Sequence, residues 1–399
     1  MTMEKKRFSR LRNSTFRDVI WPIKSSELKK FLPMAFLMFT VLLNQNLVRG
    51  MKDSIVMTLV APEVISFIKI WLELPSGIIF VLIYARMCNH MTTERAFQYV
   101  IITFLLFFAA FAFVLFPNSA YFHPSSEVVE KYIAMLPNLK WFIVIWGHWS
   151  YVLFYVMGEL WPVVVLGLVW QLANKITKTE EAKRFYSFFT FFGQANLLIS
   201  GLAIGYFASK NHFLIDAFAG VSDRTEIMLK SIMLIVLVSG LCSLLIHMVI
   251  ERQIINDAGL KHIVPKQKTL HLGVLESSKL ILRSKYLGLI CVLMISYSVA
   301  VILIEGLWFA KAKELYPNPE QFASYQRMVL FWTGISALIF ALLGSSIIRR
   351  LGWFFGAIIT PVITMIVGGL FFLLTVMQDN LDSMLIGLGQ ASTLSLIVF

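Results

Sequence analysis

Charged residues are scarce in this sequence. They make up 15% of its 399 residues, whereas 58% are hydrophobic and the mean hydropathy is +0.75. A water-soluble chain of this length and composition would expose more apolar surface than water tolerates. The composition excludes a soluble globular protein and predicts an all-α polytopic membrane protein.

Cysteine is also rare. Cys88, Cys242 and Cys291 lie in or beside apolar runs, and their spacing does not resemble that of a metal site. We interpret them as reduced residues that pack as small apolar side chains. The seven histidines are scattered along the chain. We therefore expect neither a metal nor a cofactor.

Nucleotide-hydrolysing and proteolytic motifs are absent. The sequence contains no G-x-x-x-x-G-K-[ST] phosphate loop, no H-E-x-x-H helix, no G-x-S-x-G elbow and no paired C-x-x-C. An ATP-driven pump and a membrane hydrolase therefore find no support. We predict that the protein is not an enzyme.

Long apolar runs are the main feature that is present. Each is near or above the roughly 20 residues that a bilayer helix needs. A tenth run begins near Leu385 and is still apolar at Phe399, so we expect a longer protein of which the C-terminal part is missing here. The predicted spans are 31–51, 63–87, 97–117, 141–172, 185–208, 227–250, 287–310, 326–347 and 352–377.

Lysine and arginine concentrate on one side of these spans. They are dense in the leader before residue 31, in the even-numbered connections and above all in the loop 251–286. By the positive-inside rule these segments are cytoplasmic, which also accounts for most of the net charge of +12 without nucleic acid. We predict a multi-pass inner-membrane protein with a cytoplasmic N-terminus, in a lipid bilayer and with no protein partner.

Charged residues within or against the spans are the candidate functional residues. Lys52, Glu159 and Glu305 would each cost about 2.5–3.5 kcal/mol at a helix centre, and such charges mark substrate or ion paths by default. Structural alternatives remain for the neighbouring charges. Arg49 and Lys52 would then reach the headgroups, with Asp53 paired to one of them. Lys69 and Glu73 are four apart and would then form an ion pair within one helix.

A weak internal repeat relates the first span to the seventh. Leu47-Val48-Arg49-Gly50 and Leu303-Ile304-Glu305-Gly306 are displaced by 256 positions. This repeat predicts two homologous six-helix halves of major-facilitator type, with a site between them. The expected parts are a basic leader (1–30), an N-terminal half (31–250), a basic loop (251–286) and an incomplete C-terminal half (287–399). Arg49 and Glu305 occupy matching places, so we expect them to pair in one access state.

Small-residue motifs occur in two spans. Gly201-x-x-x-Gly205 and Gly352-x-x-x-Gly356 are typical of helices that approach each other closely. We interpret both as packing sites.

Several strings resemble the nucleotide transporter family, the ATP/ADP translocases of obligate intracellular bacteria and plastids. The similarity runs from the leader to the ninth span. The strings that carry it include Trp21-Pro22-Ile23, Lys30-Phe31-Leu32-Pro33, Leu43-Asn44, Lys52-Asp53, Ile65-Ser66-Phe67 with Lys69, Glu159-Leu160-Trp161, Glu181-Ala182-Lys183-Arg184-Phe185-Tyr186, Glu305-Gly306 with Trp308, and Lys313-Glu314-Leu315-Tyr316-Pro317.

The resemblance implies an antiporter that exchanges a nucleoside triphosphate for a diphosphate, with host ATP imported against ADP. It implies transport roles for Lys52, Glu159 and Glu305. Asn44 and Lys69 lie in the strings that match the family, so we count both among the candidate substrate-binding residues. Two positions depart from the family: Phe309 replaces a lysine and Gln45 replaces a tyrosine, both near the predicted cavity.

Two alternatives to ATP/ADP exchange stay open. One is a transporter of GTP, CTP or UTP, with Phe309 stacking on the base; if its uptake is coupled to protons, Glu159 or Glu305 carries the proton. The other, more remote, is a membrane receptor that transports nothing and in which the buried charges only hold the helices together.

Overall fold

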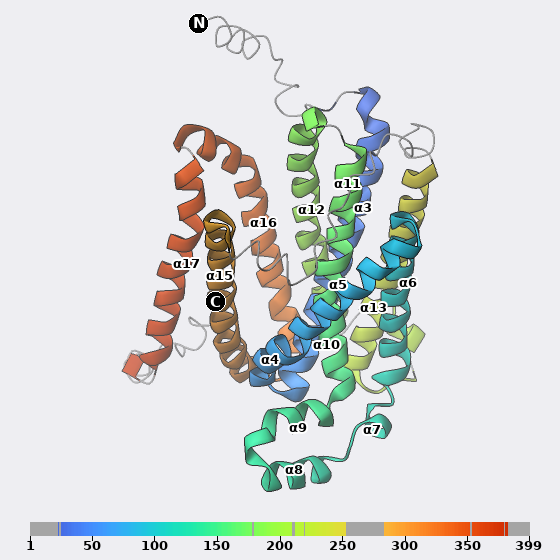
Figure 1. Cartoon of the computed structure of the whole chain (residues 1–399). Coiled ribbons are helices and arrows are strands. Elements are labelled where there is room, and N and C mark those ends of the chain that lie inside the picture. The colour runs from blue at the N-terminus through green and yellow to red at the C-terminus, as the bar shows by residue number, and fades with distance from the viewer. Residues whose placement is uncertain are drawn as a thin grey trace, which may run out of the picture.

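The structure is a computed structural model in which long helices run alongside one another (Figure 1). It describes residues 23, 25–177, 179–209, 212–218, 220–252, 283–351, 353–378, 380 and 381. Among these residues there is no strand. The α-helices are α3 (Leu28–Ile55), α4 (Pro62–Ile68), α5 (Leu74–His90), α6 (Thr93–Ala110), α7 (Ser119–Phe122), α8 (Ser126–Met135), α9 (Lys140–Gly147), α10 (Trp149–Trp161), α11 (Gly167–Ile176), α12 (Thr179–Ala208), α13 (Arg224–Ile250), α15 (Lys285–Leu315), α16 (Pro319–Leu351) and α17 (Trp353–Val376).

Shorter segments interrupt or extend these helices. Three are 3₁₀ turns: η1 (Ser25–Glu27), η5 (Pro137–Leu139) and η7 (Asp216–Phe218). Four are π-helical: η2 (Val56–Val60), η3 (Lys69–Glu73), η4 (Phe111–Leu115) and η6 (Pro162–Leu166). The π-helical segments continue α3, α4, α6 and α10, so each span remains one element with a wider turn in it.

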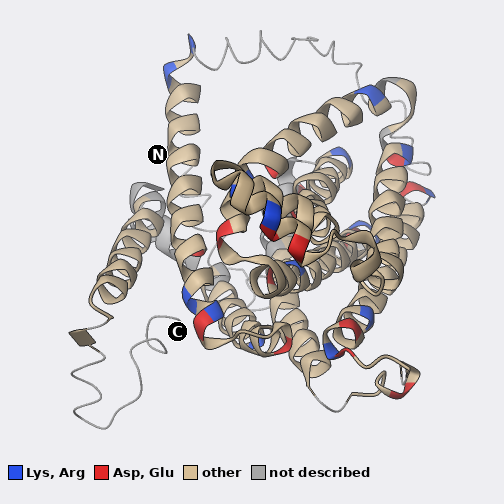
Figure 2. Ribbon diagram, turned by 90° about the horizontal axis from the view of Figure 1, so that it is seen from below, with Lys and Arg blue, Asp and Glu red and all other residues tan. Residues whose placement is uncertain are grey.

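Helices occupy all nine predicted spans. Eight stretches in the described part of the chain are long and apolar enough to cross a membrane. The helix α16 covers the remaining predicted span, 326–347. Seen along the bundle, the ribbon is mostly tan, with few charged positions (Figure 2). Most of the leader, loop residues 253–282 and the tenth run lie outside the described residues.

Two predicted boundaries are wrong. The run 141–172 is not one span, because the helix breaks at His148, which has φ −124° and ψ 35°, directly after Gly147. The fourth span begins at Trp149, and α9 lies apart from it. The fifth helix is longer than predicted, since α12 begins at Thr179 and leaves only a short connection after Ile176.

The break at His148 leaves a small helical subdomain at one end of the bundle. We call residues 119–147, with α7, α8 and α9, the cap (Figure 1). The bundle end that carries it is the cap end, and the opposite end, where α3 begins, is the leader end. At the base of the cap, His123 Nε2 lies 2.7 Å from Ser150 Oγ of α10.

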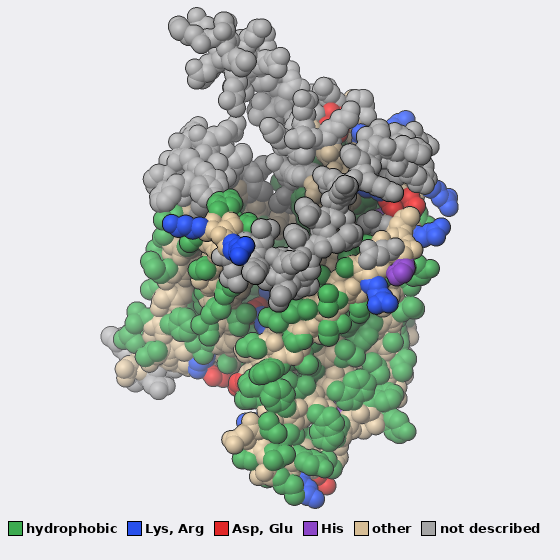
Figure 3. Space-filling view, viewed as in Figure 1, with side chains coloured by type: hydrophobic (Ala, Val, Ile, Leu, Met, Phe, Trp, Pro, Cys, Tyr) green, Lys and Arg blue, Asp and Glu red, His purple; other side chains and the backbone are tan. Residues whose placement is uncertain are grey.

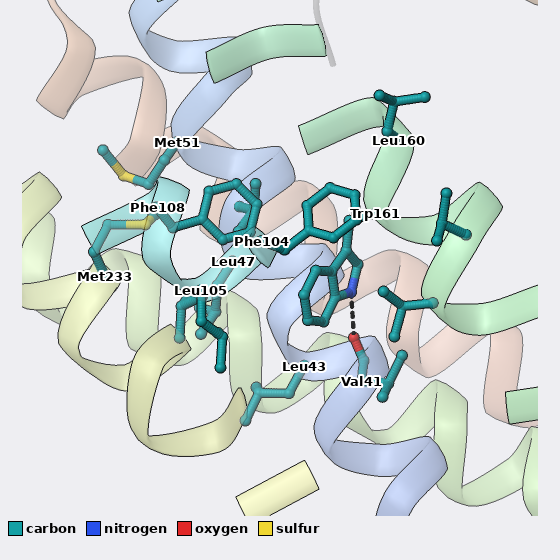
Figure 4. Packing of buried hydrophobic residues seen from close by; sticks show 14 of the residues in the cluster. Val41, Leu43, Leu47, Met51, Phe104, Leu105, Phe108, Leu160, Trp161 and Met233 are labelled. Atoms are coloured by element: carbon teal, nitrogen blue, oxygen red, sulfur yellow. Dashed lines mark hydrogen bonds between the residues drawn. The ribbon is translucent and has the colours of Figure 1, made fainter. Parts of the chain in front are cut away.

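The hydrophobic core centres on α3, which packs against α10, α12 and α13. Trp161 is fully buried, and its Nε1 donates a hydrogen bond of 3.0 Å to the carbonyl oxygen of Val41 (Figure 4). The ring of Phe104 meets it edge-on at 5.5 Å between centroids, and Phe108 lies at 6.0 Å. Satisfying the indole N–H inside the bundle lets this large side chain be buried without an unpaired donor. The hydrogen bond from Trp161 to Val41 fixes α10 against α3.

Close contact between α12 and α16 joins the first six spans to the later ones. A Cβ at Gly201 would lie 3.0 Å from the carbonyl oxygen of Arg327 and 3.2 Å from Leu330 Cβ. At Gly205 a Cβ would overlap the Arg327 side chain. The packing interpretation of this glycine motif is therefore confirmed. Gly352, in the second motif, lies outside the described residues.

Candidate functional site

Charged side chains from four spans line one cavity of about 160 Å³. They come from α3, η3, α10 and α15. Most of the predicted charged residues are among them. The lining residues are Gln45, Arg49, Lys52, Lys69, Gly158, Glu159, Pro162 and Glu305.

Lys52 is the most deeply buried cation of this site. Its side chain is 2% exposed, and its Nζ lies 2.5 Å from Asp53 Oδ1 and 2.7 Å from Glu159 Oε1. The same Nζ lies 3.8 Å from the ring centroid of Tyr155. Two carboxylates and an aromatic face surround an ammonium group that has three N–H donors. We call Lys52, Asp53, Tyr155 and Glu159 the Lys52 cluster.

A glycine makes room for the lysine stem. A Cβ at Gly158 would lie 2.8 Å from Lys52 Cδ and 3.0 Å from Val48 Cγ1. Any larger residue would push α10 away from α3 or displace the lysine. The burial of Lys52 contradicts the alternative in which its amino group reaches the headgroups.

Glu305 joins α15 to two other elements. Its Oε1 accepts a hydrogen bond of 3.1 Å from Arg49 Nη2, and its Oε2 accepts one of 2.5 Å from Lys69 Nζ. The expected pair between Arg49 and Glu305 is therefore present. We call Glu305, Arg49 and Lys69 the Glu305 cluster. Arg49 Nε also lies 3.7 Å from Asp53 Oδ2, which connects this cluster to the Lys52 cluster.

The two clusters balance in charge: three cations face three carboxylates. An unpaired charge enclosed in a membrane protein costs several kcal/mol, so mutual pairing is the arrangement that an empty site favours. An anionic ligand can use these cations only by separating them from their carboxylates. The site is therefore suited to a ligand whose anionic groups replace the carboxylates as partners of the three cations.

Wider helical turns position two of the elements. Lys69 begins the π-helical segment η3, and Pro162 begins η6 directly after the turn that carries Glu159. Proline lacks an N–H and its ring crowds the carbonyl four residues earlier, so Pro75 and Pro162 each disturb regular α-helical bonding. Such π-helical turns occur frequently at functional sites.

Three predictions about individual side chains have different outcomes. Gln45 lines the cavity as expected, and its Oε1 is buried without a hydrogen-bond partner. Asn44 is fully buried but is not among the lining residues, because the next residue along a helix points about 100° away. Phe309 is 1% exposed and packs on Trp308 and Phe322, with centroids at 5.1 Å and 6.2 Å.

Phe309 therefore points into the packing between α15 and α16, and the expectation that it lies near the cavity is wrong for this conformation. The structural alternative for Lys69, an ion pair with Glu73 within one helix, is contradicted as well, because Lys69 bonds to Glu305 instead.

Sequence reasoning missed two contributors to the site, Tyr155 and Gly158. Tyr155 lies one helical turn before Glu159, so helical spacing alone would have found it. Gly158 gave no signal without knowledge of its neighbour. Glu73 Oε2 is buried and accepts no hydrogen bond, although the carboxylate lies within electrostatic range of Glu159, Lys69 and Lys52.

Comparison with known proteins supports a membrane carrier. Residues 5–399 match the family described as TLC ATP/ADP transporter. ADP,ATP carrier protein 3 of Rickettsia conorii is 40% identical over 375 residues, which cover 92% of this chain and 74% of the relative. ADP,ATP carrier protein 5 of Rickettsia bellii is 37% identical over 393 residues, covering 98% and 78%. No solved structure is significantly similar. This chain belongs to the TLC ATP/ADP transporter family.

Proposed function

We propose that this protein is an antiporter that imports ATP in exchange for ADP across a bacterial inner membrane, by alternating access and without covalent chemistry. The observation that carries the proposal is the cavity in which Lys52, Lys69 and Arg49 face carboxylates within the span region. The family match and the carriers named above support ATP and ADP as substrates.

In this conformation the cavity is too small for a nucleotide. Its volume of about 160 Å³ is below the roughly 300–1,000 Å³ typical of ligand pockets. A bound triphosphate, with about four negative charges, would compete with Glu305 and Glu159 for the same cations. Binding would then break ion pairs and enlarge the cavity in one step. This couples occupancy of the site to movement of α15 relative to α3 and η3.

Contacts near the cap end support a conformation that is closed there. The helix α15 packs on α4 and η2, and a Cβ at Gly306 would lie 3.4 Å from Ser66 Oγ. Phe309 and Phe322 are buried on the same side of the site. We infer that this is the state in which the site is shielded from the cap end.

The proposed architecture has two halves of major-facilitator type, one formed by residues 31–250 and one that begins at residue 287, with the leader 1–30 and the loop 251–286 on the cytoplasmic side. The positive-inside rule supports this orientation. In it the cap end faces away from the cytoplasm, and host nucleotide would enter from that side.

Gln45 favours a second candidate, transport of a nucleotide other than ATP. Its amide carries a buried, unpartnered oxygen at the edge of the cavity, and the resemblance predicts a tyrosine there. An amide discriminates between base edges by hydrogen bonding, whereas an aromatic ring stacks on any base. Competition of ATP, GTP, CTP and UTP against labelled ATP distinguishes the two candidates.

Counter-flow in vesicles tests the exchange. Reconstituted protein should take up labelled ATP only when the vesicles contain ADP or ATP, and AMP-loaded vesicles are the matched control. Equal uptake into empty vesicles that an uncoupler abolishes would indicate proton-coupled import instead. Absence of uptake of every nucleotide, with correctly inserted protein, would contradict transport and favour a receptor.

A further inference from the structure

The cap runs crosswise to the spans. In Figure 1, α8 and α9 lie across the lower end of the bundle. They contain 10 and 8 residues, too few to cross a bilayer, which takes about 20. Helices of this orientation and length lie either in the surrounding water or in the interfacial layer of the membrane. The distribution of their side chains decides between the two.

One side of α8 faces the protein and another faces water. Val129 is buried, and a Cβ at Gly147 of α9 would lie 3.7 Å from Val129 Cβ. At about 100° per residue, Glu127, Glu130 and Lys131 share a separate sector, and all three are exposed. Figure 3 shows charged side chains at the tip of this end.

A third sector of α8 is both apolar and exposed. It consists of Val128, Tyr132 and Met135, whose exposed fractions are 39%, 45% and 61%. Helical spacing places it between the buried sector and the charged one. A helix in water gains nothing from exposing such a sector, whereas a helix at a membrane surface buries it among lipid chains.

This apolar sector continues across α9 to the wall of the bundle. Tyr132 meets Trp146 edge-on at 5.9 Å between centroids. Phe142, one turn earlier on α9, meets Trp71 of η3 at 5.7 Å. Trp146 and Trp71 are 47% and 56% exposed, and the exposed apolar side chains of α5 follow directly, beginning with Leu74. Figure 3 shows hydrophobic side chains over the front of this end.

We propose that α8 and α9 form an in-plane hairpin that inserts its apolar sector into the bilayer interface at the cap end. Lipid is the occupant because this surface is continuous with the exposed apolar side chains of α5, which belongs to a stretch long and apolar enough to cross a membrane. Its tryptophans and tyrosine are the residue types that favour the interfacial layer. The charged sector of α8 stays in water.

The proposal does not depend on the transported solute or on which membrane face carries the cap. The ring centroids of Phe67 in α4 and Trp141 in α9 are 6.1 Å apart, so the hairpin packs on the helix that leads to Lys69. An inserted hairpin would hold α4 at a fixed depth while α15 moves.

Two neighbouring positions on α8 give a matched test. Met135 lies in the apolar sector, and Ala134 lies among the charged residues; both are exposed. Cys88, Cys242 and Cys291 are first replaced by serine, and Met135→Cys or Ala134→Cys is then labelled with an environment-sensitive fluorophore. The protein is reconstituted in phosphatidylethanolamine and phosphatidylglycerol vesicles, with nitroxide-bearing lipid or a water-soluble quencher added.

A label at 135 should emit at shorter wavelength than one at 134 and be quenched by nitroxide lipid, whereas the label at 134 should be quenched from water. If both labels behave as water-exposed, the proposal is overturned. If the label at 135 is shielded only at high protein-to-lipid ratio and escapes nitroxide lipid, a second copy covers the sector, which also overturns it.

Discussion

The Lys52 cluster and the Glu305 cluster contain the same kinds of side chain but differ in burial and in what they connect. Lys52 and Asp53 are 2% and 4% exposed, and the cluster stays within α3 and α10. In the Glu305 cluster Arg49 is 56% exposed, and the carboxylate joins α15 to α3 and η3. The Lys52 cluster keeps a buried cation within the first six spans. The ion pairs of the Glu305 cluster are reachable by solvent and join separate elements, so they can break when these elements move apart. We infer that Lys52 supplies binding energy for the nucleotide and that the ion pairs of Glu305 form a latch, which holds α15 against α3 and η3 until a nucleotide binds.

The largest effect is expected from Lys52. Lys52→Met keeps the length of the side chain but leaves Asp53 and Glu159 without their shared cation. A hydrogen bond to a charged group contributes about 1.5–3 kcal/mol, and Lys52 offers more than one such bond to a phosphate, so ATP uptake should fall by about a hundredfold or more. Lys52→Arg, which keeps the charge, is the matched control and should retain more activity.

Uptake is to be compared at equal membrane abundance of each variant. If Lys52→Met transports as well as the wild type, Lys52 is not a nucleotide ligand. The inference that the Lys52 cluster supplies binding energy would then be wrong.

The next effect separates paired from unpaired carboxylates. Glu159→Gln removes a partner 2.7 Å from Lys52 Nζ and should slow exchange by about tenfold or more, because hydrogen bonds to charged groups contribute about 1.5–3 kcal/mol. Glu73→Gln removes no hydrogen bond at Oε2, so its exchange rate should differ from that of the wild type by no more than about 0.5 kcal/mol in activation free energy. Initial exchange rates decide; equal losses in both variants would contradict the distinction.

A double-mutant cycle addresses the latch. Arg49→Gln and Glu305→Gln should each impair exchange, and the double variant should be less impaired than the two single effects combined. Residues in contact typically couple by about 0.5–3 kcal/mol. Swapping the two charges is less informative, since the swap would place a second cation beside Lys69 and a second carboxylate beside Asp53. Strict additivity in exchange rates would show that the pair does not act as a unit.

The smallest expected effect lies in the cap, away from both clusters. Burial, with a smaller contribution from His148, lowers the pKa of His123 below its usual 6.5. The folded protein therefore favours neutral His123, and the unfolded chain binds more protons as the pH falls. Stability should decrease as the pH falls below about 6.5, the usual pKa of histidine, because the unfolded chain then binds the proton and the folded protein does not. Thermal unfolding of wild type and His123→Gln measures this; an unchanged pH dependence in the variant would assign the effect elsewhere.

Much of this site was predictable, because charge inside a membrane span is conspicuous. Lys52, Glu159 and Glu305 were found that way, and the internal repeat predicted the contact between Arg49 and Glu305, which the ion pair confirms. The partner of Lys69 was not predictable, because local spacing offered Glu73 whereas the carboxylate that binds it is 236 positions away.

Orientation within a helix was the other limit of the sequence. Phe309 and Asn44 belong to the right helices, yet the side chain of Phe309 is directed by how α15 crosses α16, and that of Asn44 by the face of α3 that other helices cover. The transport roles of the site residues stay predictions, as does the division into two halves.

Cross-linking beside the latch tests the central claim, that α15 moves relative to η3 during exchange, because α4, which η3 continues, packs on α15. Ser66 and Gly306 face each other, with 3.4 Å between Ser66 Oγ and a Cβ placed at Gly306, so Ser66→Cys with Gly306→Cys should form a disulfide in the background free of other cysteines. Val129→Cys with Gly147→Cys, whose Cβ atoms would be 3.7 Å apart within the cap, is the matched control. Oxidation should stop ATP/ADP exchange in the first variant, reductant should restore it, and the cap disulfide should leave exchange unchanged. Undiminished exchange with the Ser66→Cys and Gly306→Cys disulfide fully formed would contradict the latch.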